Sequence, residues 1–67
     1  MKPIATFIND KDGLASRIFR TESGFIVTLM DIDAKRELPT KWHFQEQERA
    51  YKRAEFLLFP ERFTTEP

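Results

Sequence analysis

The chain of 67 residues contains no cysteine and a single histidine. The lack of cysteine excludes disulfides and thiolate metal sites, and one histidine excludes an imidazole-rich zinc site. A chain of this length makes one domain, residues 1–67, and buries only about 60% of the surface that its unfolded state exposes. Because small domains often depend on disulfides, a metal or a partner chain, we expect this one to depend on a well-packed core, on self-association or on a binding partner.

The chain also lacks an excess of charge of either sign and a long apolar run. Eleven basic and eleven acidic residues cancel, whereas nucleic-acid-binding proteins usually carry net positive charge. No apolar run approaches the roughly 20 residues of a membrane-spanning helix. Residues 1–4 lack the long apolar stretch of a secretory signal. We therefore expect a cytoplasmic protein with no membrane contact, for which a protein is a better candidate partner than nucleic acid.

Few residues could carry catalysis or hold a cofactor. Gly13 and Gly24 are the only glycines, so the chain has no glycine-rich phosphate-binding loop. Ser16 and Ser23 lack the glycine-flanked context of a nucleophile elbow. His43 could act as a general base, but no nucleophile or orienting partner is evident near it in the sequence. We therefore expect a protein that is not an enzyme and uses no cofactor.

One acidic pair could in principle bind a metal ion. Asp31 and Asp33 form a D-x-D pattern at the end of a predicted strand, and such carboxylates can hold Mg²⁺. Aspartate also favours turns because its side chain bonds to the local backbone. We expect the turn role, and no metal site.

Four short segments are rich in β-branched and aromatic residues, as strands are. They are residues 4–8, 14–20, 25–32 and 40–44. Turn-forming residues separate the first three, and a polar loop at 33–39 that ends in proline precedes the fourth. A helix is predicted over 45–59, because apolar side chains share one stripe and Pro60 ends it. The stripe consists of Gln47, Ala50, Tyr51, Ala54, Leu57 and Leu58.

Together these segments predict an α+β fold. It has an antiparallel sheet of three to four strands in meander order, with one C-terminal helix packed on one face. Residues 61–67 are expected to form a flexible tail. No Ser, Thr, Asp or Asn lies just before the helix to cap it.

The hairpin loop at 21–24 decides which residues share a face of the sheet. Gly24 favours a three-residue loop, which pairs Phe19 with Val27 and turns Phe19 toward the helix. The opposite, back face then holds Ile18, Ile26 and Met30, edged by Arg20 and Thr28. A two-residue loop would exchange Ile18 with Phe19 but leave Ile26 and Met30 on the back.

One helix covers one face, so we expect apolar side chains to be exposed on the back face. Three interpretations stay open. This face could bind a partner, form a homodimer interface, or be partly shielded by the first strand and by long side chains such as Arg17 and Arg20. We expect association.

The outer side of the predicted helix carries Arg49, Lys52, Arg53 and Phe56. A small domain rarely leaves a large aromatic side chain on a basic helix face unless something covers it. Either a partner covers it, since arginine and aromatic residues dominate interface hot spots, or the C-terminal segment does. The predicted partner-binding residues are therefore Ile18, Arg20, Ile26, Met30, Arg49, Lys52, Arg53 and Phe56.

Four segments of the chain resemble small uncharacterised bacteriophage proteins with a β-meander followed by one amphipathic helix. They are residues 13–21, 24–33, 42–44 and 50–54. The resemblance implies a fold rather than site residues; some phage proteins of this kind inhibit host enzymes by docking on them. The element order is also similar to the DNA-binding arm domain of tyrosine integrases and to plant AP2 domains. The chain departs from those domains because its predicted back face is apolar rather than basic.

Three functional hypotheses follow from these features. The first is a small protein-binding module, phage-encoded and acting on a host protein in the host cytoplasm. The second is a DNA-binding domain that uses Arg17, Arg20, Lys41 and the basic helix face. The third is a structural homodimer.

Overall fold

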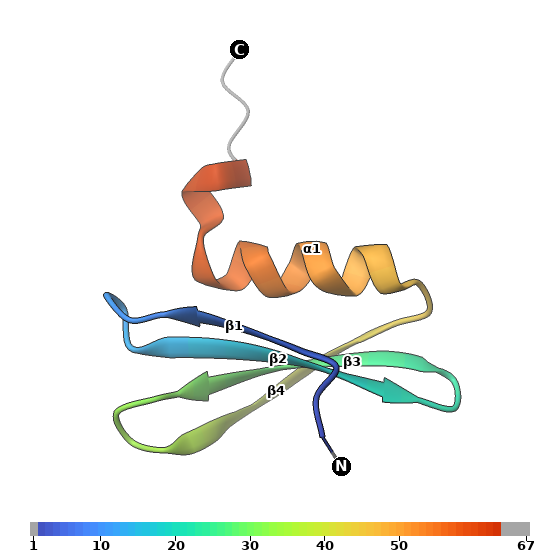
Figure 1. Ribbon diagram of the computed structural model, residues 1–67, viewed down its shortest axis with the longest axis horizontal. Helices are drawn as coiled ribbons and strands as arrows, with labels where there is room; N and C mark the ends of the chain where they lie inside the picture. Colours follow the sequence, from blue (N-terminus) through green and yellow to red (C-terminus); the bar gives the residue numbers. More distant parts are fainter. Residues whose placement is uncertain (1, 64–67) are drawn as a thin grey trace.

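Four antiparallel strands form one sheet, and a single α-helix crosses one of its faces (Figure 1). The structure is a computed structural model, in which residues 2–63 are described. The elements follow the chain as β1 (Ala5–Asn9), β2 (Leu14–Thr21), β3 (Gly24–Asp31), β4 (Arg36–Phe44), α1 (Gln47–Leu58) and the 3₁₀-helix η1 (Pro60–Phe63). The strand order β1-β2-β3-β4 confirms the predicted α+β meander with its C-terminal helix on one face.

Most boundaries agree with the sequence-based prediction to within one or two residues, and two segments differ from it further. The strand predicted at 40–44 begins at Arg36, so the loop predicted at 33–39 is wrong for residues 36–39. Pro39 is tolerated in β4 because this strand lies at the edge of the sheet and its pairing is irregular opposite Thr28/Met30. The predicted tail starts within η1, and residues 64–67 lie outside the described part of the chain.

The predicted three-residue loop between β2 and β3 is also wrong. Thr21 pairs with Gly24 across a two-residue loop, so Ile18 lies opposite Val27 and Phe19 opposite Ile26. A shift of one residue moves every side chain of a strand to the other face. Ile18 is therefore fully buried under α1, and Phe19 lies on the back face.

Small and β-branched side chains fill the layer between α1 and the sheet. Its buried centre consists of Ile18, Val27, Ala50 and Ala54. The two alanines lie one helical turn apart on the face of α1 that meets the sheet, and their short side chains let the helix approach it closely. Half-buried aromatic residues surround this centre: Phe7, Phe25, Trp42, Phe44 and Tyr51.

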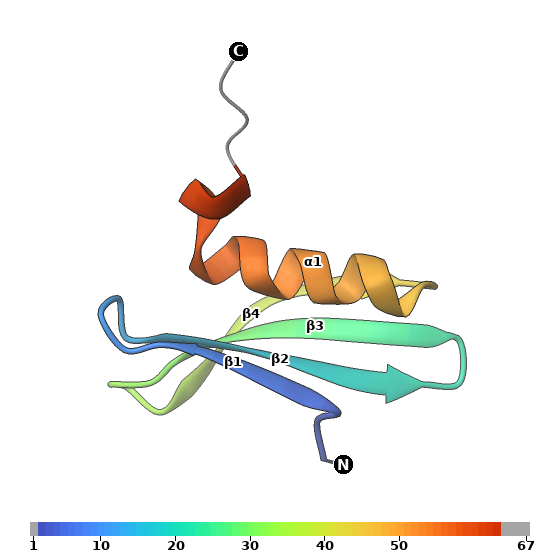
Figure 2. The same cartoon turned by 45° about the horizontal axis from the view of Figure 1, so that its top comes forward.

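Two side-chain hydrogen bonds tie the second half of α1 to the sheet. The hydroxyl of Ser16 in β2 donates to the carbonyl oxygen of Ala54 over 2.9 Å. The amide of Asn9 in β1 donates to the carbonyl oxygen of Leu58 over 2.8 Å. At the other end of α1, Glu46 is the N-cap residue and makes no side-chain capping bond. Both hydrogen bonds to the sheet therefore lie in the C-terminal half of α1, the helix that crosses the sheet in Figure 2.

Candidate functional site

A groove of about 510 Å³ lies between the end of β4 and the outer side of α1. It is lined by Phe44 from the strand and by Arg49, Lys52, Arg53 and Phe56 from the helix. The structure therefore brings together the four residues predicted for the basic helix face. It adds Phe44, for which the sequence predicts only a position in a strand.

Helix geometry explains why Phe56 faces outward. It follows the buried Ala54 by two positions, which is about 200° around an α-helix. Its side chain is 41% exposed. The guanidinium of Arg53 lies 5.6 Å from the centre of the Phe56 ring, within the distance of a cation–π contact. The groove thus combines an aromatic surface with a cation held beside it.

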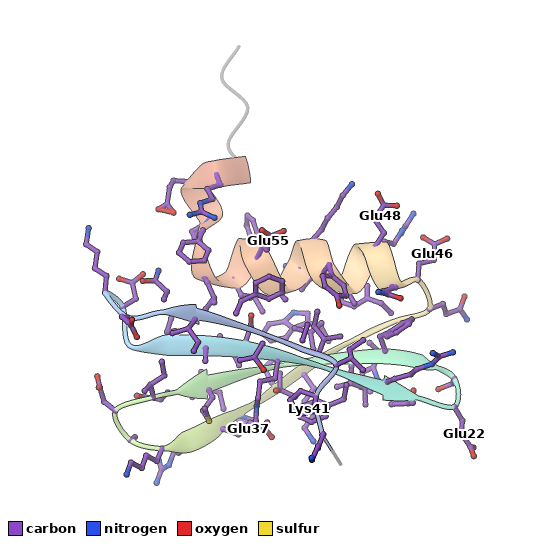
Figure 3. All side chains as sticks on the ribbon, in the orientation of Figure 1. Glu22, Glu37, Lys41, Glu46, Glu48 and Glu55 are labelled. Carbon is purple, nitrogen blue, oxygen red and sulfur yellow. The ribbon has the colours of Figure 1, made fainter. Side chains whose placement is uncertain are left out.

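Acidic side chains at the start of α1 pair with two of the groove cations. Arg49 lies 3.0 Å from Glu46, and Lys52 lies 4.0 Å from Glu48. All four side chains are at least 68% exposed, and such exposed pairs contribute little stability. Figure 3 shows Glu46 and Glu48 on the outer side of α1, away from the sheet. Both cations can therefore exchange their carboxylate for that of another molecule at small cost.

Phe44 also lines two smaller hollows beside the groove. One, of about 370 Å³, is bordered by His43, Gln45, Glu46 and Arg49 as well. The other, of about 240 Å³, reaches the β2–β3 loop, where its lining consists of Thr21, Ser23, Phe25, His43, Phe44 and Gln45. A hollowed surface therefore continues from α1 around the β4–α1 connection to the β2–β3 loop.

The back face of the sheet consists of three rows of side chains that run across the strands. The first holds Ile8, Ala15 and Met30, which are apolar, and ends at Glu37 in β4. The middle row is polar and holds Thr6, Arg17, Thr28 and Lys41. The third holds Phe19, Ile26 and His43. Figure 3 shows Lys41, with Glu37, on this side of the sheet.

Arg17 shields much of this face. Its guanidinium lies 2.7 Å from the carboxylate of Glu37 and 5.4 Å from the centre of the Phe19 ring. Ile26 and Met30 are half-buried in this arrangement. One of the three interpretations of the back face was partial shielding by long side chains. Arg17 provides such shielding.

Two of the predicted partner-binding residues need correction. Ile18 is on the helix face with no exposed surface, so it cannot contact a partner. Arg20 follows Ile18 on that same face, opposite Phe25. Both residues were predicted on the wrong face because the two-residue loop reverses the faces of β2. Arg20 is exposed on the helix face, so its role in partner binding stays a prediction. Ile26 and Met30 do lie on the back face, apart from the groove.

The polar residues that were candidates for catalysis or metal binding lie apart from one another in the fold. The carboxylate of Asp31 accepts the backbone N–H of Ala34 over 3.1 Å and so closes the β3–β4 turn, while Asp33 is exposed. Ser16 is buried beneath α1. His43 is exposed at the edge strand, opposite Ile26. Across residues 2–63, no group of three or more His, Cys, Asp or Glu side chains is arranged to hold a metal ion.

Sequence reasoning missed two exposed apolar residues at β1. Ile8 is 55% exposed and Ile4 is 42% exposed. The sequence contains the information needed to predict the exposure of Ile8. Successive side chains of a strand point to opposite faces, so Ile8 and its neighbour Phe7 cannot both face the helix.

The described residues include no helix with the length and apolar character needed to cross a bilayer.

Comparisons of the chain with protein-family models, with curated proteins and with solved structures found no match. The function is therefore inferred from the geometry of the groove and of the sheet.

Proposed function

We propose that this protein is a small, non-enzymatic protein-binding module that holds an acidic segment of a partner protein in the groove between β4 and α1. One observation carries this proposal: three cations and two phenylalanines line the same groove, and no acidic side chain of residues 2–63 lines it. Arginine and aromatic residues are the side chains that most often dominate interface hot spots. Positive charge selects a partner surface of negative charge.

Binding would use the groove in two ways. Carboxylates of the partner would replace Glu46 and Glu48 at Arg49 and Lys52, and this exchange costs little because exposed ion pairs contribute only about 0–1 kcal/mol. An apolar side chain of the partner would cover the exposed part of the Phe56 ring. Removing that surface from water supplies the main attraction, and the charges supply specificity.

The resemblance to small bacteriophage proteins extends the proposal to the partner's origin. On this reading the chain is phage-encoded, works in the host cytoplasm and binds a host protein. The acidic, partly apolar segment required by the groove is what would distinguish that host protein from others.

DNA binding is less well supported. On the back face, Arg17 is paired with Glu37, and a net charge of zero gives no long-range attraction to DNA. DNA is nevertheless one outcome that the following experiment distinguishes.

The test is affinity capture from a bacterial lysate with four immobilised forms of the protein. They are the wild type, Phe56→Ser, Arg53→Ala and the control Lys41→Ala. Lys41→Ala removes one exposed cation from the back face, so it matches the charge change of Arg53→Ala without touching the groove. We expect one stoichiometric partner to be retained by the wild type and by Lys41→Ala, and to be lost from both groove variants.

Titration of the recovered partner should then show a loss of about 30-fold in affinity for Phe56→Ser, as for a hot-spot aromatic residue worth roughly 2 kcal/mol. Recovery of no specific protein, or equal recovery by all four forms, would contradict the proposal. A labelled DNA duplex at low ionic strength forms the second arm. Its binding to the wild type, weakened equally by Arg53→Ala and Lys41→Ala, would assign the function to DNA instead.

A further inference from the structure

The outer edge of β1 is open and apolar. Within residues 2–63, β1 lies at the end of the strand order and pairs with β2 alone, and Figure 2 shows it along the margin of the sheet. Ile8 within this strand and Ile4 just before it are two of the three exposed large apolar residues of the described chain. An edge strand presents unpaired backbone N–H and C=O groups, which form a template for another strand.

The other edge of the sheet is protected, and the difference is informative. β4 contains Pro39 and Lys41, and its pairing with β3 is irregular between Thr28 and Met30. Proline, lysine and bulges are the features that keep edge strands from pairing with other chains. β1 has the sequence ATFIN, with no charge and no proline. Only one of the two edges is therefore suited to strand addition.

The register of the sheet tells which backbone groups of β1 face outward. In an antiparallel pair, the residues that exchange hydrogen bonds alternate along the strand. The N–H of Ile32 donates to the carbonyl oxygen of Gly13, its opposite residue, so the odd-numbered residues of β2 bond to β3. The even-numbered residues of β2 then bond to odd-numbered residues of β1, which leaves the N–H and C=O of Thr6 and Ile8 pointing outward.

We propose that β1 pairs antiparallel with β1 of a second copy of this chain and joins two sheets into one. The register that pairs all five residues places Phe7 opposite Phe7 of the second copy. Thr6 of each copy then lies opposite Ile8 of the other, so the outward-pointing groups meet as hydrogen-bonded pairs. The side chains of residues that lie opposite each other point to the same face of a sheet. Both Phe7 side chains, and with them both α1 helices, therefore lie on the same face of the joined sheet.

Charge distribution favours a second copy as the occupant. Antiparallel pairing brings the end of one β1 that carries Lys2 beside the β1–β2 turn of the other copy, where the exposed Asp10 and Asp12 outnumber the exposed Lys11. The same complementarity occurs twice, once at each end, and no like charges lie opposite each other within β1. A five-residue strand buries less than the roughly 1,200 Å² of a stable interface, so we expect reversible dimers at concentrations of roughly tens of micromolar.

Sedimentation velocity over a concentration series tests this pairing. Thr6→Pro removes an outward N–H, which an edge strand tolerates, and Thr6→Val is its control because it keeps that N–H. Ile8→Lys places a charge on the edge and is independent of any effect of proline on folding. We expect the wild type and Thr6→Val to dimerise with rising concentration, and Thr6→Pro and Ile8→Lys to stay monomeric with the circular dichroism of the wild type.

Amide hydrogen exchange gives a second measurement on the wild type. Exchange at Thr6 and Ile8 should slow as dimers form, while exchange at exposed loop residues such as Ser23 should not change. A wild type that is monomeric at about 1 mM, or a folded Ile8→Lys that dimerises like the wild type, would overturn the proposal. Phe56→Ser should dimerise normally, so the pairing of β1 and the function of the groove succeed or fail separately.

Discussion

Arg17 and Glu37 connect two strands that are not neighbours. The guanidinium of Arg17 in β2 reaches across β3 and lies 2.7 Å from the carboxylate of Glu37 in β4. Thr28, which lies opposite Arg17 on the intervening strand, is only 3% exposed although it is on the face without the helix. The long side chain of Arg17 therefore covers part of the back face, as α1 covers the opposite face of the sheet.

Arg17→Ala should lower the free energy of unfolding more than Glu37→Gln does. The alanine removes the packing of the arginine side chain over Phe19 and Thr28, at a cost of about 1–2 kcal/mol. Glu37→Gln removes only the charge from a pair whose side chains are 29% and 34% exposed, which costs roughly 0.5 kcal/mol. Urea denaturation of both variants measures the difference. Equal losses would mean that the ion pair, not the packing, stabilises this face.

Thr28→Val should raise the free energy of unfolding by about 1 kcal/mol. The hydroxyl of Thr28 is buried, and no described residue makes a hydrogen bond with it. Valine has nearly the same shape and no polar atom to bury. Thr40→Val is the control, because Thr40 lies in β4 but is exposed. A decrease in stability for Thr28→Val, measured by thermal unfolding, would show that its hydroxyl is satisfied in solution.

Ser16→Ala should destabilise the fold by about 1–2 kcal/mol. Its hydroxyl is fully buried and donates to Ala54 of α1, so the substitution removes a bond between the helix and the sheet. Ser23→Ala, in the exposed β2–β3 loop, provides the matched change without a buried contact. Chemical denaturation of the two variants should therefore give clearly different midpoints; coincident midpoints would exclude an anchoring role for Ser16.

The two glycines should differ in their tolerance of alanine. Gly24 has a φ of 146°, and a β-carbon there would lie 2.3 Å from the backbone oxygen of Phe44. Gly13 has a φ of 67°, and a β-carbon there would meet the side chain of Asp33 at 2.7 Å, which can move. We expect Gly13→Ala to cost about 1–2 kcal/mol and Gly24→Ala to cost at least 3 kcal/mol.

Thermal unfolding checks this ranking. Gly24→Ala should also weaken binding in the groove at temperatures where it is still folded, since its β-carbon would displace Phe44. A Gly24→Ala variant as stable as Gly13→Ala would contradict the close contact between the start of β3 and the end of β4.

Glu46→Asp should stabilise α1 by about 0.5–1 kcal/mol. Glu46 is the N-cap residue but makes no capping bond, and the shorter aspartate side chain is suited to accept an N–H of the first turn. Gln45→Asp adds a carboxylate one position earlier, outside the N-cap, and serves as the control. Glu46→Asp leaves the charge of the helix start unchanged, so a midpoint that rises for Gln45→Asp alone would point to a general effect of negative charge there and would contradict the capping role.

The helix was the element most completely predicted from sequence. Its apolar stripe has a period that only an α-helix satisfies, and three of its predicted members, Ala50, Ala54 and Leu58, are buried. The outward position of Phe56 followed from that same period. The groove itself was only half predicted, because Phe44 joins it through the meeting of β4 with α1, and no local pattern encodes that approach.

The faces of β2 were predicted incorrectly for a related reason. Gly24 is compatible with hairpin loops of two or three residues, and the neighbouring Ile18 and Phe19 are both apolar, so alternation alone does not choose between them. The choice depends on the space under α1. Next to Val27, Ala50 and Ala54, that space holds the side chain of Ile18, and the larger ring of Phe19 lies on the other face.

Local periodicity and composition by themselves determined the type and order of the strands and of α1, because each pattern refers to residues a few positions apart. Tertiary packing decided the register of β2, the extension of β4 through Pro39, the cover that Arg17 provides and the outward direction of the β1 edge. Each of these depends on which side chains from distant parts of the chain fit into one volume, and that fit is a property of the assembled layers rather than of any single segment.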